Sequence, residues 1–249
     1  MCGICGVVSV NNSIPVNSEL IRKMMSAIQH RGPDDSGYHL GDGTALGHTR
    51  LSIIDLATGH QPIYNQDRTK CIIFNSEIYN YLDLREGLIA KGHEFSTKSD
   101  TEVILHLYEE KGYDCVNKLR GMFAFGIWDM ENRVLFIARD RLGIKPLYYS
   151  ANSKWICFSS EIKSLLISGL VDRKLNLPSI DQYLALNYTI GPETMIKGVR
   201  KLMPGQFLAF KDGRTTITQY WDFGRLKVFM DSFDQCFQKM EALIEESIK

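Results

Sequence analysis

The sequence lacks the features that mark several large protein classes. Its 29 basic and 29 acidic side chains cancel, which argues against a nucleic-acid-binding protein, because such proteins usually present a basic face. No apolar run approaches the ~20 residues of a membrane span. The chain does not begin with a basic segment followed by an apolar stretch, as a signal peptide does. We therefore expect a cytoplasmic protein that binds neither nucleic acid nor a membrane.

The chain also has no phosphate-binding G-x-x-x-x-G-K-[ST] loop and no internal repeat. Cys2 and Cys5 form a C-x-x-C pair, but no second pair and no H-x-x-x-H spacing accompany it. We therefore predict no metal site. The six cysteines are scattered, which is typical of reduced thiols in a cytosolic protein.

The residues that are present indicate an ordinary globular chain. A length of 249 residues, 44% of them hydrophobic, suffices for one large domain with an appendage. Residues 4–10 read as a buried strand, and Ser18 is predicted to cap a helix. Segments 122–129 and 134–139 look like a hairpin, and another helix is expected from Ser99 or Asp100 to Gly112. Antiparallel strand pairs in separate runs from helices predict an α+β fold.

The end of the chain has a different pattern. We predict a domain over residues 1–224, followed by a linker and helix over 225–249. From Asp231 the apolar residues follow helical spacing and form a stripe of Phe233, Phe237, Met240, Ile244 and Ile248. Two interpretations are open: the helix docks on its own domain, or the stripe belongs against a further domain.

Cys2 is the first candidate for chemistry. Removal of Met1 would leave a thiol and a free α-amine on one residue, so that a nucleophile and a base stand together. Their ordinary pKa values, about 8.5 and about 7.7–8.0, both lie close to neutral pH. If Met1 is retained, the amine is held in an amide bond and the chain is inactive or a precursor.

Five separated stretches together form a specific pattern. The chain resembles the glutaminase domain of class II glutamine amidotransferases, and most closely that of glutamine-hydrolysing asparagine synthetases, from about residue 2 to 224. The resemblance implies an N-terminal-nucleophile hydrolase fold, in which two antiparallel sheets stack face to face between outer helices as four αββα layers. The stretches are His30–Asp34, Gly47–Asp55, Phe74–Asn80, Ser99–Glu102 and Arg139–Leu147.

The resemblance assigns catalytic roles to three residues. The family's nucleophile falls on Cys2, and its oxyanion hole falls on the Asn75 side chain and the backbone N–H of Ser76. An amide N–H aimed at developing negative charge is worth roughly 10²–10³ in rate. Considered alone, Asn75 could equally be a turn former.

The same resemblance assigns the glutamine-binding residues. Arg50 matches the residue that holds the substrate carboxylate, and Glu77 and Asp100 match those that hold its ammonium. Asn75 and Ser76 of the oxyanion hole also count among the substrate-binding residues. Leu51 and Ile53 of the Arg50 stretch also fall at the substrate. A guanidinium suits a carboxylate and a carboxylate suits an ammonium. Taken singly, Arg50 could be a surface ion pair and Asp100 a helix N-cap.

The implied reaction is hydrolysis of L-glutamine through a γ-glutamyl thioester on Cys2, with no metal or organic cofactor. ATP and Mg²⁺ are expected only for a synthetase domain, acting in cis or in trans, which these 249 residues do not contain. That domain would use the released ammonia. Alternatively, a second copy of the chain could cover the C-terminal stripe in a homodimer.

One departure from the family pattern leaves other functions open. Ser76 replaces the family's glycine, and crowding, or strain if the position needs φ > 0, predicts a slowed enzyme that Ser76→Gly would accelerate. The alternatives are an amidase for another acyl substrate, a non-catalytic domain with an assembly or regulatory role, and an amidotransferase with a different ammonia acceptor.

Overall fold

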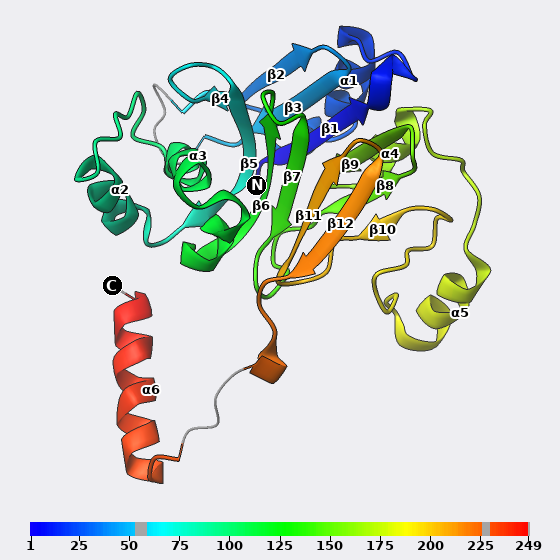
Figure 1. Ribbon diagram of the computed structural model, residues 1–249. Helices are drawn as coiled ribbons and strands as arrows, with labels where there is room; N and C mark the ends of the chain where they lie inside the picture. Colours follow the sequence, from blue (N-terminus) through cyan, green and yellow to red (C-terminus); the bar gives the residue numbers. More distant parts are fainter. Residues whose placement is uncertain (53–58, 226–229, 249) are drawn as a thin grey trace.

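The computed structural model describes residues 1–52, 59–225 and 230–248. Within these ranges the strands form two antiparallel sheets of six strands each (Figure 1). The first sheet has the order β10-β8-β9-β1-β3-β2, and the second β12-β11-β7-β6-β5-β4. The bounds in the first sheet are β1 (Gly3–Ser9), β2 (Asp35–Gly41), β3 (Thr44–Arg50), β8 (Tyr148–Ala151), β9 (Trp155–Ser159) and β10 (Arg200–Lys201). Those in the second are β4 (Ile63–Tyr64), β5 (Lys70–Ile78), β6 (Gly121–Asp129), β7 (Val134–Arg139), β11 (Gln206–Lys211) and β12 (Arg214–Gln219).

Strand β1 is buried on both faces, as its apolar sequence predicts. Alternate residues of a strand point to opposite faces. Ile4 and Val8 pack into the layer between the sheets, where they meet Ile73 of the second sheet. Cys5 and Val7 belong to a separate cluster with the helices outside the first sheet. One strand therefore joins two hydrophobic layers.

Phe158 lies between two glycines of the facing sheets. A Cβ atom placed on Gly6 of β1 would collide with the Phe158 ring, and one on Gly126 of β6 would come within 2.9 Å of it. The ring is fully buried. The missing side chains of the two glycines thus make room for one aromatic ring in the layer between the sheets.

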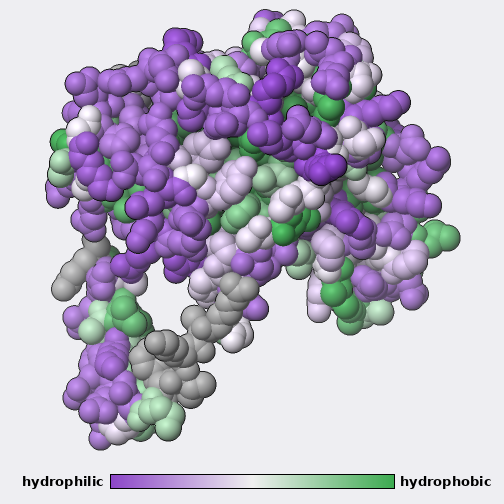
Figure 2. Space-filling view, in the orientation of Figure 1, coloured by the Kyte–Doolittle hydropathy of each residue, from purple (hydrophilic) through white to green (hydrophobic). Residues whose placement is uncertain are grey.

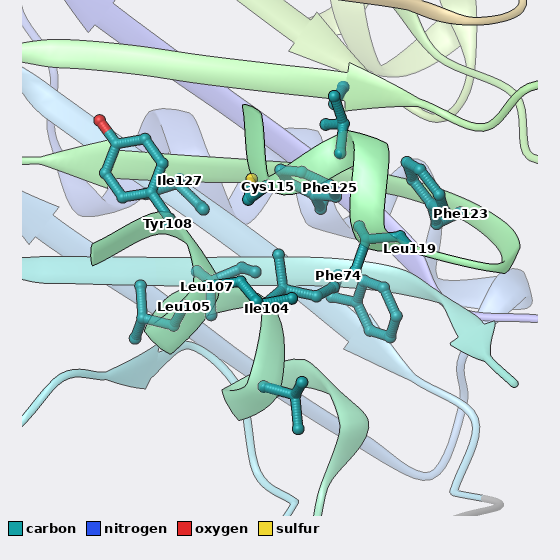
Figure 3. Close-up of a cluster of buried hydrophobic side chains, with 14 of the residues drawn as sticks. Phe74, Ile104, Leu105, Leu107, Tyr108, Cys115, Leu119, Phe123, Phe125 and Ile127 are labelled. Atoms are coloured by element: carbon teal, nitrogen blue, oxygen red, sulfur yellow. The ribbon is translucent and has the colours of Figure 1, made fainter. Parts of the chain in front are cut away.

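Helices cover the outer face of each sheet. Ile21, Met24 and Leu165 of α1 and α4 pack against the first sheet. Figure 3 shows the apolar side of α3, with Ile104 and Leu107, against Phe74 and Phe125 of the second sheet. This αββα arrangement confirms the predicted α+β sandwich. The helices are α1 (Ser18–Ser26), α2 (Tyr81–Ile89), α3 (Asp100–Lys111), α4 (Ile162–Ile167), α5 (Leu177–Leu186) and α6 (Phe233–Ile248).

The predicted Ser18 cap was wrong by one residue, whereas the predicted start of the second helix at Ser99 or Asp100 is confirmed by α3. Ser18 is already helical, and Asn17 is the N-cap of α1, because its side chain accepts a hydrogen bond from the Leu20 N–H. Ser99 caps α3 by accepting from the Thr101 N–H, so Asp100 is not the cap. Asparagine and serine are both good caps, and the sequence alone does not separate neighbours of this kind. The predicted hairpin is confirmed as β6 paired with β7.

Helix α6 extends away from the two sheets (Figure 1). Its stripe residues are exposed by between 51% for Phe237 and 82% for Phe233, and green and pale green areas interrupt the purple surface of this helix at the lower left of Figure 2. An ion pair joins Glu246 of this helix to Arg120 at 3.6 Å, and both side chains are exposed. The interpretation that the stripe docks on its own domain is therefore wrong for this structure. Among the described helices, none is long and apolar enough to cross a membrane.

Candidate active site

A pocket of about 190 Å³ collects the predicted site residues. Its volume lies below the ~300–1,000 Å³ typical of drug-sized ligands, which suits a small molecule such as an amino acid. Cys2, Arg50, Leu51, Asn75, Ser76, Glu77 and Asp100 all line it. Ile53, the remaining predicted residue, lies outside the described residues. Met1, Gly59, Gln61, Phe74, Ser99, Thr101, Met122 and Lys145 complete the lining.

The pairing of β1 with β3 places Cys2 beside Arg50 and Leu51. Gly3 lies opposite Thr49 in this pair, so the residue before Gly3 meets the residues after Thr49. The Leu51 N–H donates to the Cys2 sulfur at 3.4 Å, and the thiol can in turn donate to the Leu51 carbonyl at 3.6 Å. Arg50 is buried at the end of β3 and does not lie on the surface. The thiol is thus held at one wall of the pocket.

Burial raises the pKa of the Cys2 thiol. This increase is larger than the decrease caused by the Leu51 N–H, the chain's N-terminal ammonium, Arg50 and Lys145. The thiol is therefore protonated at neutral pH. Since the thiolate is the nucleophilic form, attack requires a base that accepts the thiol proton.

The stretch from His30 to Asp34 fixes the backbone of Cys2. Arg31 Nε donates to the Cys2 carbonyl at 2.9 Å, while Arg31 Nη1 donates to Glu161 Oε1 at 3.0 Å. A Cβ on Gly32 would collide with the backbone of Thr49. This motif therefore holds the backbone around Cys2 and does not line the pocket.

Asn75 lies on β5, in the second sheet, so it is not a turn former. Its side chain is 1% exposed, and among the described residues neither Oδ1 nor Nδ2 has a hydrogen-bond partner. The backbone next to it is fixed on both sides. His48 Nε2 of β3 donates across the sheets to the Phe74 carbonyl at 3.0 Å, and the Phe74 N–H donates to Gln61 Oε1 at 2.7 Å. Burial lowers the pKa of His48 to about 3, so this histidine is neutral.

Ser76 follows Asn75 in the same strand. Its hydroxyl donates to the Met122 carbonyl of the neighbouring strand β6. The residue is absent from the non-glycine positions with positive φ in the described part of the chain. The strain that we expected if this position needed φ > 0 is therefore not present, because ordinary strand geometry accommodates serine.

Glu77 and Asp100 place two carboxyl groups on the pocket wall. Asp100 Oδ2 accepts from the Ile78 N–H at 3.0 Å. Burial raises the pKa of Asp100 to about 6; the Ile78 N–H opposes this rise and the Glu77 carboxylate adds to it. Burial also raises the pKa of Glu77. A positively charged group bound between these carboxylates would relieve their repulsion.

Lys145 is a pocket residue that the sequence analysis did not assign, although it stands within one of the quoted stretches. It is 5% exposed, and burial lowers the pKa of its ammonium, while Glu77 and Cys2 act in the opposite direction. Two hydrogen bonds shape the loop that carries Lys145. Asp140 Oδ2 accepts from the Lys145 N–H at 2.9 Å, and Arg139 Nε donates to the Lys145 carbonyl at 2.7 Å. The pocket lining thus includes two cationic side chains and two carboxyl groups.

The fold and pocket define a protein with the four-layer architecture of the N-terminal-nucleophile hydrolases and a cysteine at its second position. The family model described as the glutamine amidotransferase domain matches residues 1–221. The chain belongs to this family and is an enzyme domain of the glutamine amidotransferase class. The predicted resemblance is therefore confirmed.

Similar curated proteins carry the same domain within longer chains. Asparagine synthetase [glutamine-hydrolyzing] 1 of Bacillus subtilis (strain 168) is 41% identical over 251 residues, which cover 98% of this chain and 39% of that protein. Asparagine synthetase [glutamine-hydrolyzing] 3 of the same organism is 36% identical over 252 residues, 100% of this chain and 41% of that protein. The chain therefore spans about two fifths of the length of these relatives.

Solved structures support the fold. The glutamine phosphoribosylpyrophosphate amidotransferase of B. subtilis, complexed with ADP and GMP, superposes with a TM-score of 0.65 at 20% identity, covering 88% of this chain and 49% of that one. A structure described as the allosteric regulatory enzyme of purine biosynthesis gives 0.66 at 18% identity, with the same coverage. At these identities the likeness shows the shared fold alone.

Proposed function

We propose that this chain hydrolyses L-glutamine to glutamate and ammonia through a γ-glutamyl thioester on Cys2. The ammonia would serve asparagine synthesis by an ATP-dependent synthetase domain. The observation that carries the proposal is the Asn75 side chain, which lines the same pocket as Cys2 and whose two buried polar atoms have no hydrogen-bond partner among the residues that the structure describes. Leaving a polar group unsatisfied costs about 1–3 kcal/mol. A ligand that supplies the missing hydrogen bonds explains why the residue is tolerated there.

The charges around the pocket fit the two ends of an α-amino acid. Arg50 binds the α-carboxylate, since a guanidinium can form two parallel hydrogen bonds with it. Asp100 and Glu77 bind the α-ammonium. This arrangement directs the side-chain carboxamide toward Cys2, where the Asn75 Nδ2 and the Ser76 N–H receive its oxygen. An amidase for simple acyl groups has no use for these charged residues.

The proposed reaction uses groups of this chain alone, with no metal or organic cofactor. Once Met1 is removed, the α-amine of Cys2 accepts the thiol proton and the sulfur attacks the carboxamide carbon. The amine then returns that proton to the departing nitrogen, which leaves as ammonia. Water attacks the resulting thioester, and glutamate and the thiol are released. ATP and Mg²⁺ belong to the synthetase half.

The names of the relatives favour asparagine as the final product, and a different ammonia acceptor remains the alternative. The exposed stripe on α6 fits contact with a further domain, and the relatives' chains are long enough to hold one. On this proposal, residues 225–249 form the connection from the 1–224 domain to the synthetase domain. The buried Asn75 amide, which has no hydrogen-bond partner in the described part of the chain, favours a ligand-binding site over a non-catalytic domain.

The test is glutamate release from L-glutamine by the chain with Met1 removed. Cys2→Ala and retention of Met1 should each abolish release, because each removes half of the nucleophile–base pair. A diazo-ketone analogue of glutamine should label Cys2 alone. Because Cys236 is also partly accessible, labelling is compared with a Cys236→Ser variant. Labelling at Cys5 or Cys71, or activity in Cys2→Ala, would exclude the proposal, and faster turnover of simple N-acyl amides would favour the amidase.

A further inference from the structure

A second group of potential ligands lies away from the pocket, at the other end of α3. His93 follows α2 in the chain, while His106 and Glu109 lie on α3. His93 Nδ1 faces His106 Nδ1 at 3.1 Å, and His106 Nδ1 faces Glu109 Oε2 at 3.0 Å. The third side, from His93 Nδ1 to Glu109 Oε2, measures 4.0 Å. Two nitrogens and one oxygen thus form a compact triangle.

This triangle has the size of one face of a tetrahedral metal site. Zinc binds histidine nitrogen and carboxylate oxygen at about 2.0–2.2 Å, which puts tetrahedral ligand atoms about 3.3–3.5 Å apart. The three observed separations lie on either side of that value. Side-chain shifts of a few tenths of an ångström would make them equal.

The second nitrogen of each histidine faces a carboxylate. His93 Nε2 lies 3.3 Å from Glu110 Oε1, and His106 Nε2 lies 3.7 Å from Glu102 Oε1. In the described part of the chain, His106 Nε2 is buried without a hydrogen-bond partner. Metal-bound histidines nearly always donate their other N–H to such a group, which fixes the ring orientation. A carboxylate behind both rings is an observation independent of the triangle itself.

Glu109 is also oriented, because Asn65 Nδ2 donates to its other oxygen at 2.8 Å. The side chain of His106 is 5% exposed, while those of His93 and Glu109 are 18% and 26% exposed. An ion can therefore reach the triangle from solvent. At most one of the two facing Nδ1 atoms can carry a proton, so the other presents a lone pair. Three carboxylates, those of Glu102, Glu109 and Glu110, face the two rings, and Lys91 pairs with Glu110 at 2.6 Å.

We propose that His93, His106 and Glu109 bind one divalent transition-metal ion of the zinc class, with water completing its shell. The ion would tie the segment after α2 to α3. Glu102 already joins the same parts, since its carboxylate accepts from the backbone and hydroxyl groups of Ser96 and Thr97. The proposal does not depend on the glutaminase assignment. It departs from the prediction of no metal site, which rested on spacing along the chain.

The test is metal binding by a chain carrying Cys2→Ala and Cys236→Ser, so that neither accessible thiol contributes a ligand. Equilibrium dialysis against Zn²⁺ should give about one tightly bound ion per chain. Co²⁺ should give the visible bands of a tetrahedral site without a sulfur charge-transfer band. Zn²⁺ should also raise the melting temperature, because it binds the folded chain.

Three variants locate the ion. His93→Gln should weaken binding by more than about 100-fold and remove the cobalt bands, while Glu110→Gln, behind the ring, should weaken it by about 10–100-fold. His30→Gln, a histidine paired with Glu161 elsewhere, is the matched control and should bind as before. If His93→Gln is poorly folded, Glu109→Gln replaces it. The proposal would be overturned if His93→Gln and Glu109→Gln both bound Zn²⁺ as tightly as the parent chain. Loss of Zn²⁺ binding in His30→Gln alone would also overturn it.

Discussion

Replacing Asn75 with leucine should lower the activity of the protein and raise its stability. Leucine has the same branching at Cγ as asparagine, so the shape of the side chain is largely kept. The two polar atoms that lack partners in the described structure are replaced by methyl groups. The substitution therefore removes a proposed oxyanion donor and an unsatisfied buried amide together.

The two effects have different magnitudes. Loss of one oxyanion-hole donor lowers kcat by about 10²–10³, which corresponds to about 2.7–4 kcal/mol in the transition state. Removal of a buried polar group without partners should raise the free energy of unfolding by about 1–3 kcal/mol. The variant should therefore be much slower and yet more stable, with a KM for glutamine that changes far less than kcat.

Glutamate release at saturating glutamine and urea unfolding measure the two quantities. Asn176→Leu is the control, because this amide donates to Ser179 Oγ at 2.8 Å and to the Thr194 carbonyl at 3.0 Å. It should lose stability, because its partners are left unpaired, and keep its activity. A destabilised Asn75→Leu, or one with less than a tenfold fall in kcat, would refute the reasoning.

Four further outcomes are expected. Burial raises the pKa of Asp100 to about 6, so this carboxylate loses its charge as the pH falls through that value, and the KM for glutamine should rise at lower pH. Asp100→Asn should abolish this pH dependence and raise the KM at every pH. Lys145→Met removes a cation that stabilises the Cys2 thiolate, so the acid limb of the kcat/KM profile should move to higher pH; an unmoved limb would contradict this role. Ser76→Gly should not raise kcat and should lower stability by about 1 kcal/mol, because it loses a hydrogen bond and relieves no positive φ; a faster enzyme would restore the crowding explanation. Amide hydrogens along α6 should exchange rapidly in the isolated monomeric chain, and strong protection of the 237–244 segment would mean that the stripe is covered.

Local patterns in the sequence predicted individual strands and the α+β class, whereas the four-layer fold and most of the pocket were predicted from the resemblance of separated motifs to a known family. An unbroken apolar run predicts a strand buried on both sides, and β1 has that environment. The separated motifs identified Arg50, Asn75 and Asp100, which the structure brings to one pocket. The exact helix caps could not be chosen, because adjacent Asn17 and Ser18 have similar capping preferences.

Other parts of the site depend on pairs that are distant in sequence. Nothing near His48 in the chain indicates that it donates across the sheets to Phe74. Gln61 and Lys145 join the pocket only because loops from different strands converge there. The role predicted for Ile53 stays a prediction, as does the domain boundary at residue 224.

The position of Phe158 between Gly6 and Gly126 has a consequence for how the rate can vary among related sequences. Cys2 extends from the sheet that contains Gly6, whereas Asn75 belongs to the sheet that contains Gly126. The thickness of the layer filled by this ring therefore helps to set the gap between Cys2, the proposed nucleophile, and Asn75, the proposed oxyanion donor. A displacement of about 1 Å can cost about 100-fold in rate, while an overpacked core usually costs only about 1–3 kcal/mol in stability. Substitutions in this layer can thus tune turnover in a folded protein without altering any residue that touches the substrate.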